Sequence, residues 1–67
     1  MKKYRIEIWQ FHSITATYES DDIVDVLTWF KGNWYWVYDD GHCAFYVYRD
    51  GHEEINFDEL CDLGFYD

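Results

Sequence analysis

The sequence is poor in basic residues, and this shortage limits the partners that it can bind. It has five Lys and Arg against 14 Asp and Glu, and its net charge is −9 at pH 7. Three of the five bases lie within the first five residues, so residues 6–67 carry two bases and a net charge of −12. Such a surface repels phosphate and anionic lipid, so we expect no direct binding of nucleic acid or of a membrane surface.

The chain also lacks the length that large catalytic folds need. With 67 residues it is expected to form one domain, 1–67, and a domain of about 60 residues buries only roughly 60% of its unfolded surface. Rossmann, P-loop and barrel enzymes are therefore excluded. The sequence contains no proline and four glycines, and it has no linker, low-complexity segment or domain boundary.

No apolar run approaches the ~20 residues that a membrane-spanning helix needs. The polar residues 1–5 lead directly into an alternating pattern, without the apolar region of a signal peptide. We therefore expect a cytoplasmic protein, or one of the host cytoplasm if a phage encodes it. The two cysteines, Cys43 and Cys61, are expected as reduced thiols, and a single bridge between them is the alternative.

Aromatic residues are abundant, with four Trp, seven Tyr and five Phe making up 24% of the chain. Together with an apolar content of 49%, they can bury far more surface than the acidic chains that stay disordered. We therefore expect a folded protein.

Residues 3–11 alternate as in a half-buried strand. One face carries Tyr4, Ile6 and Ile8, and the other carries Lys3, Arg5, Glu7, Trp9 and Phe11. After a turn near residues 10–13, a second strand places Ile14, Ala16 and Tyr18 on one face. The two strands are predicted to form a hairpin.

A helix is predicted over residues 21–31. The acidic segment 20–22 supplies its N-cap, and its apolar stripe has the spacing i, i+3, i+4, i+7: Ile23, Val26, Leu27 and Phe30. Gly32 is expected as the residue that ends this helix, and Lys31 suits the helix dipole there.

A second hairpin is predicted where the turn Asp40-Gly41 separates two aromatic strands, 34–38 and 42–48. One face, the better core, carries Trp34, Trp36, Tyr38, Cys43, Phe45 and Val47, and the other carries Tyr35, Val37, Ala44, Tyr46 and Tyr48. Asp50-Gly51 then returns the chain as a short strand over 52–55. The fold class is therefore α+β, a four- to five-stranded antiparallel sheet (ββαββ) with one main helix on one face and a short C-terminal helix.

The C-terminal helix is indicated by caps at both ends. Asn56 is expected as the N-cap, with Glu59 completing a capping-box-like pair, and Gly64 as the residue that stops the helix. The main helix covers only one sheet face, so several side chains are left to water, to the C-terminal helix or to a partner: Tyr35, Tyr46, Tyr48, Val37, Trp9 and Phe11. A contiguous exposed aromatic patch usually marks an interaction surface.

No motif predicts catalysis or a metal site. The phrase Asp-Gly-His occurs twice, at 40–42 and 50–52, but the two turns lie at opposite ends of one strand, about 20 Å apart. Zinc and calcium ligand patterns are absent from the sequence. Nucleophilic catalysis would need a cysteine beside a histidine and an orienting group, but Cys43 is expected to face the core beside Trp36 and Phe45 as a small apolar residue. Cys61 lies on the short C-terminal helix, either packed or half exposed. We therefore expect no enzyme, no metal and no cofactor.

The acidic residues gather at predicted turns and helix starts. Local preferences of Asp for turns and N-caps explain some of them, but leave others unexplained: Asp25, Glu53, Glu54, Asp62 and Asp67. An acidic surface favours cationic partners, above all a basic groove built for nucleic acid. The predicted partner-binding residues are Tyr35, Tyr46, Tyr48, Asp39, Asp40, Asp50, Glu53, Glu54, Asp58 and Asp62.

In size, acidity and aromatic content the chain resembles small phage-encoded proteins that block host enzymes or anti-phage defences, some of which imitate DNA. The resemblance covers size and composition only and assigns no residue. It implies an inhibitor or regulator, of the anti-CRISPR or DNA-mimic type, that occupies a basic site on a nucleic-acid-binding protein or enzyme. The alternative is a homodimeric interaction or scaffold module, in which symmetry buries the tyrosine face and the acids keep the protein soluble.

Overall fold

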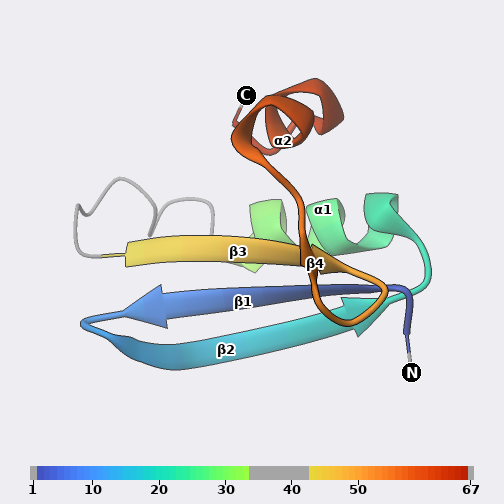
Figure 1. The fold of residues 1–67 in the computed structure, drawn as a ribbon. Coiled ribbons are helices and arrows are strands. Elements are labelled where there is room, and N and C mark those ends of the chain that lie inside the picture. Colours follow the sequence, from blue (N-terminus) through green and yellow to red (C-terminus); the bar gives the residue numbers. More distant parts are fainter. Residues whose placement is uncertain (1, 34–42, 67) are drawn as a thin grey trace.

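Alternating strands and two capped helices form an α+β fold (Figure 1). The computed structural model describes residues 2–33 and 43–66. Its elements are β1 (Tyr4–Gln10), β2 (Ser13–Ser20), α1 (Ile23–Asn33), β3 (Cys43–Arg49), β4 (Glu53–Glu54) and α2 (Phe57–Leu63). The predicted strand over 34–38 and the Asp40-Gly41 turn lie outside the described residues.

The four described strands form one antiparallel sheet in the order β2-β1-β3-β4. This arrangement confirms the predicted fold class and the predicted hairpin of β1 with β2. The central strand β1 also pairs with β3, so that Ile6 lies opposite Val47 and Ile8 lies opposite Phe45. Because opposite residues point to the same face, these side chains form the apolar face of the sheet.

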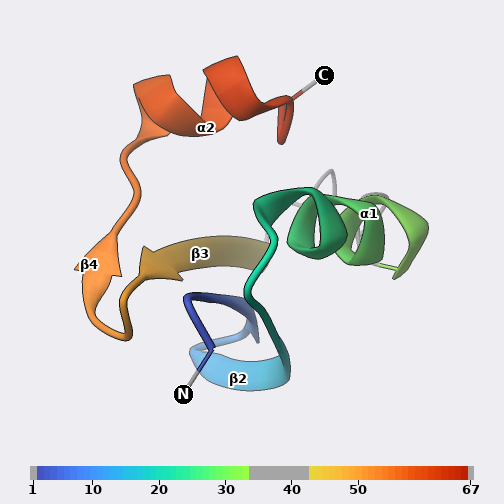
Figure 2. The ribbon, with the colours of Figure 1, turned by 90° about the vertical axis from the view of Figure 1, so that its right-hand side faces the viewer.

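Both helices lie on the apolar face, as the view nearly along the strands shows (Figure 2). The core that they close contains Ile6, Ile8, Val26, Phe30, Phe45, Val47, Ile55, Leu60 and Phe65. The rings of Phe30 and Phe45 lie 4.5 Å apart between centroids, so α1 and β3 meet through side chains in the core. The C-terminal helix therefore adds to the same core, and neither of the two described helices lies on the second face of the sheet.

The main helix begins and ends two residues later than the predicted range 21–31, while its N-cap lies in the predicted acidic segment 20–22. Asp22 is its N-cap, since the Val24 N–H donates to the Asp22 carboxylate at 2.9 Å. The predicted stripe holds, with Val26 and Phe30 buried. Gly32, however, stays inside the helix, which continues to Asn33. The expectation that Gly32 ends the helix is wrong, because glycine tolerates helical angles and the helix continues one residue past it.

The β1–β2 hairpin has two features that alternation did not predict. Its turn residues Phe11 and His12 both have positive φ, 51° and 70°, as a type I′ turn requires, so β1 ends before Phe11. The register shifts between Ile8 and Trp9, which leaves Thr15 without an opposite residue and pairs Ile14 with Trp9. Ile14 is therefore 45% exposed, and its predicted place beside Ala16 and Tyr18 is wrong.

The C-terminal segment follows its local signals closely. Asp50 and Gly51 turn the chain with φ of 55° and 89°, although β4 is shorter than the predicted strand over 52–55. The Asn56 side chain accepts from the Glu59 N–H at 2.9 Å and so caps α2. Gly64 ends α2 with a φ of 99°, a left-handed conformation that glycine adopts without steric cost.

Candidate functional site

The second face of the sheet has no helix against it among the described residues (Figure 2). Strand alternation places the odd residues of β1 there, and antiparallel register brings them opposite even residues of β3. Arg5 lies opposite Tyr48, and Glu7 lies opposite Tyr46. We call this surface the open face and define it by Arg5, Glu7, Trp9, Tyr46 and Tyr48, with Glu19 and Glu54 at its flanks.

Aromatic side chains line a hollow in the open face. Trp9, His12, Tyr46 and Tyr48 surround a space of about 390 Å³, which we call the aromatic hollow. The rings of Trp9 and Tyr46 lie 6.3 Å apart between centroids and are inclined at 87°. Tyr46 is 38% exposed. The hollow is therefore bounded by two nearly perpendicular aromatic rings, with Tyr48 as a further wall.

A polar network beside the aromatic hollow fixes its side chains. The indole Nε1–H of Trp9 donates to Glu7 Oε1 at 3.1 Å. The other oxygen of Glu7 lies 3.2 Å from Arg5 Nη2, and Arg5 Nη1 lies 4.0 Å from Glu19 Oε2. A single carboxylate thus positions both the indole and the guanidinium, so the open face presents an ordered arrangement of groups.

The electrostatic environment of the open face is negative. Burial raises the pKa of the Tyr48 phenol above its ordinary value, and the carboxylates of Glu7 and Glu54 raise it further, while Arg5 lowers it. The surface beside the phenol therefore disfavours added negative charge. Three carboxylates against one guanidinium give this face a net negative charge.

The structure brings together only part of the predicted partner-binding set. Tyr46, Tyr48 and Glu54 share the open face, with Glu54 opposite Tyr48 in the register. Exposed acids elsewhere lie at the β3–β4 turn, at the start of β4 or on α2: Asp50, Glu53, Asp58 and Asp62. The remaining predicted residues lie outside the described residues: Tyr35, Asp39 and Asp40. The described members of the set therefore do not form one continuous acidic surface.

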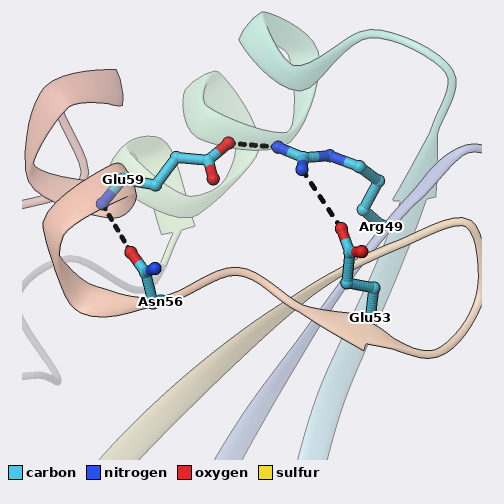
Figure 3. A network of polar contacts seen from close by, with 4 residues as sticks. All are labelled: Arg49, Glu53, Asn56 and Glu59. Atoms are coloured by element: carbon cyan, nitrogen blue, oxygen red, sulfur yellow. Dashed lines mark hydrogen bonds and ion pairs between the residues drawn. The ribbon is translucent and has the colours of Figure 1, made fainter.

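Some of the predicted acids have structural partners (Figure 3). Arg49 pairs with Glu53 at 3.2 Å and also with Glu59 on α2. The hydrogen bond that Arg49 donates to the Glu59 carboxylate is the main cause that raises the pKa of the Arg49 guanidinium. The network continues to Asn56, which caps the same helix. It thereby ties α2 to the β3–β4 hairpin, and the charge of Glu53 is partly neutralised.

The basic N-terminus is also placed against acids, because Tyr4 pairs with Ser20 at the end of β2. The Lys2 ammonium lies 3.9 Å from Asp21, and the Lys3 N–H donates to the same carboxylate at 2.9 Å. In the sequence the bases form a separate block. In the structure they offset acids at one end of the sheet, which leaves Glu54 and the acids of α2 less compensated.

Asp25, which local preferences left unexplained, has a structural role. It accepts a hydrogen bond from the Tyr18 hydroxyl at 2.9 Å. The Tyr18 ring stacks on Trp29 with a centroid separation of 5.0 Å and an interplanar angle of 5°. This arrangement joins β2 to α1, so Asp25 stabilises the fold and needs no partner to explain it.

Sequence reasoning missed Glu7 and His12 as members of the site. Glu7 and Trp9 are two residues apart in β1, so alternation predicts that they share a face. Alternation does not predict which residues of other strands lie beside Glu7. Its place beside Tyr46 depends on the pairing of β1 with β3, which no local pattern reports. His12 reaches the aromatic hollow through the left-handed turn after β1, and no glycine marks that turn.

Other functional features would be a metal site, a membrane-spanning helix or a reactive thiol in the part of the chain that the structure describes. There, no three His, Cys, Asp or Glu side chains are grouped so as to hold a metal ion, and no helix is both long and apolar enough to cross a membrane. Cys61 is a half-buried free thiol. Comparisons with protein-family models, with curated proteins and with solved structures found no match to this chain. The functional argument therefore depends on the open face itself.

Proposed function

We propose that this chain is a small acidic inhibitor or regulator that binds another protein through its open face. The observation that carries the proposal is that Trp9, Tyr46 and Tyr48 form a hollow on the sheet face that neither helix covers. Aromatic side chains in such positions supply the large contact area of interface hot spots. These three side chains lie on the face opposite the core, so core packing does not account for them.

Charge determines the kind of partner. The chain has a net charge of −9, and the carboxylates of Glu7 and Glu54 lie opposite Tyr46 and Tyr48 of the aromatic hollow. Complementary charge accelerates association with a basic surface and disfavours acidic ones. The partner surface that fits best is a basic groove, such as the one with which a protein holds nucleic acid. A bound acidic chain would block such a groove by occupying it and by repelling phosphate.

The size of the chain limits how it can act. A stable protein interface covers about 800 Å² on each partner, and the whole chain exposes 4422 Å². The interface would thus take close to a fifth of the surface, more than the aromatic hollow alone provides. We infer that contacts extend to the flanking strands, where Glu19 and Glu54 lie. Function as a phage-encoded anti-defence protein is one form of this proposal, supported by size and composition.

Affinity capture with the immobilised chain tests the proposal. Two variants form a matched pair: Tyr46→Ala removes a ring from the open face, and Phe57→Ala removes a ring that is 60% exposed on α2. We expect the wild type and Phe57→Ala to retain basic proteins at low salt, and Tyr46→Ala to lose them. Raising the salt should release the captured proteins steeply. Capture that is insensitive both to salt and to Tyr46→Ala would refute the proposal.

Sedimentation equilibrium of the free chain distinguishes the alternative function, a homodimeric interaction or scaffold module. If two copies bury their open faces against each other, the chain sediments as a dimer at micromolar concentration, and Tyr46→Ala dissociates it. A monomer under these conditions rules out the homodimer and leaves the open face available to a different protein.

A further inference from the structure

We propose that the aromatic hollow is a receptor for one arginine side chain of the partner protein. This inference rests on the proposed function and specifies the chemistry of its central contact. The guanidinium would stack on one ring of the aromatic hollow, meet a second ring with its edge, and pair with the carboxylate of Glu54.

The shape of the aromatic hollow suits a flat cation. Its volume of about 390 Å³ is near the lower end of the range of roughly 300–1,000 Å³ for small-molecule pockets, which fits a side chain better than a cofactor. The planes of Trp9 and Tyr46 are nearly perpendicular, at 87°. A planar group can therefore lie on one ring face while its edge meets the other ring.

Electrostatics favour a cation over any other planar group. Aromatic faces carry a negative quadrupole that attracts cations. The carboxylates of Glu7 and Glu54 add to this field, as their effect on the Tyr48 phenol indicates. A nucleotide could stack on the same rings, but its phosphate would meet an acidic surface. The aromatic hollow is thus selective for positive charge.

One carboxylate remains available for the incoming cation. Glu7 is engaged by Trp9 and Arg5, and Glu19 lies near Arg5. Among residues 2–33 and 43–66, the side chain of Glu54 makes no hydrogen bond or ion pair. It lies opposite Tyr48 in the register, beside the aromatic hollow. The open face already holds the guanidinium of Arg5 between two carboxylates, and Glu54 offers an equivalent place for a second one.

Arginine fits these groups better than lysine. Its guanidinium is planar and weakly hydrated, stacks on aromatic faces and binds a carboxylate through two parallel hydrogen bonds. The lysine ammonium is compact and strongly hydrated, and it has no flat face to stack. We therefore expect the aromatic hollow to prefer arginine among basic side chains.

Titration of the full chain with Nα-acetyl-arginine amide tests the inference by NMR. The matched probes are Nα-acetyl-citrulline amide, which has the same shape without the charge, and Nα-acetyl-lysine amide. We expect saturable shifts of the Trp9 indole N–H and of the Tyr46 and Tyr48 resonances with the arginine probe. Binding of the lysine probe should be weaker, and the citrulline probe should cause no saturable shift.

Variants assign the binding to the aromatic hollow. Glu54→Gln changes an exposed side chain and preserves the fold, and we expect it to weaken binding of the arginine probe by about fivefold. Tyr46→Leu should abolish saturable binding, whereas Phe57→Leu, on α2, should leave it unchanged. If Tyr46→Leu fails to fold by circular dichroism, Glu54→Gln alone decides the question.

Three outcomes would overturn the inference. These are equal shifts with arginine and citrulline, shifts outside the aromatic hollow, and binding unaffected by Glu54→Gln. Shifts that depend on protein concentration, with a dimer in sedimentation, would show that a second copy occupies the hollow instead. Loss of partner capture by Tyr46→Ala without any arginine binding leaves the proposed function standing and refutes only this inference. Arginine binding without any captured basic protein refutes the proposed function, and with it the assignment of the bound arginine to a partner protein.

Discussion

Phe65 is the side chain whose removal most directly tests how α2 is attached. It lies just after the helix, is 1% exposed and has ring centroids 5.8 Å from Phe30 and 5.9 Å from Phe45. Truncation of a buried phenylalanine to alanine costs about 3–5 kcal/mol. A domain of 67 residues has a total stability of roughly 3–10 kcal/mol. Phe65→Ala should therefore remove a large share of the stability, and the variant should be at the edge of unfolding.

Urea unfolding followed by circular dichroism measures this loss. The control is Phe57→Ala on the same helix, where the ring is 60% exposed, so its cost should stay below about 1 kcal/mol. If Phe65→Ala is unfolded in water, Phe65→Leu keeps most of the apolar volume and should cost about 1–2 kcal/mol. A cost for Phe65→Ala no larger than that for Phe57→Ala would refute the packing of α2 on the sheet.

Three further predictions concern a turn, a titrating group and an ion pair. Replacing Phe11-His12 by Asn-Gly puts residues that tolerate the left-handed conformation at both turn positions. This change should raise the free energy of unfolding, measured with urea, by about 1 kcal/mol after the entropy cost of glycine. An unchanged urea midpoint would contradict the turn conformation. The pKa of Tyr48 is raised above 10.0, so its contribution is fully present below pH 10 and is lost as pH rises through the folded-state pKa. The free energy of unfolding should therefore fall less steeply with pH above pH 10 in Tyr48→Phe than in the wild type. Equal slopes in the two proteins would count against the raised pKa of Tyr48. Arg49→Met removes the pairing with Glu59 and should speed amide exchange in α2 while leaving the β1–β2 hairpin unchanged; equal acceleration in both segments would exclude a local role.

The parts of the fold that depend on short-range chemistry were predictable from the sequence. Asp22 and Asn56 cap their helices as expected, and Gly64 ends the second one. Each cap depends on a side chain and a backbone N–H within three residues of each other, and Gly64 acts through its own left-handed backbone. The same holds for the Asp50-Gly51 turn, whose residue types favour positive φ.

The parts that depend on distant residues were not predictable. The displaced Ile14 follows from a bulge at Thr15, which alternation cannot reveal because the sequence on both sides still alternates. Gly32 has the residue type of a helix end, yet the helix continues to Asn33. The residue type of Gly32 therefore did not determine where the helix ends, since Asn33 also adopts helical geometry.

The candidate site shows the same division. Tyr46 and Tyr48 were placed on the second face from the period of a strand, and the structure places them there. The aromatic hollow also needs Trp9 and His12, which come from a segment more than thirty residues earlier. The role of Asp25 was hidden for the same reason, since its partner Tyr18 lies on a different element.

The division of each central strand into two faces has a consequence for how this protein can change. The core takes the even-numbered residues of β1 and the odd-numbered residues of β3. The open face takes the odd-numbered residues of β1 and the even-numbered residues of β3. Substitutions at Arg5, Glu7, Trp9, Tyr46 and Tyr48 can therefore alter what is recognised while the packing beneath stays intact. Such an arrangement lets binding diversify quickly against a partner that itself mutates. A library randomised at these five positions should contain many folded members with new specificities.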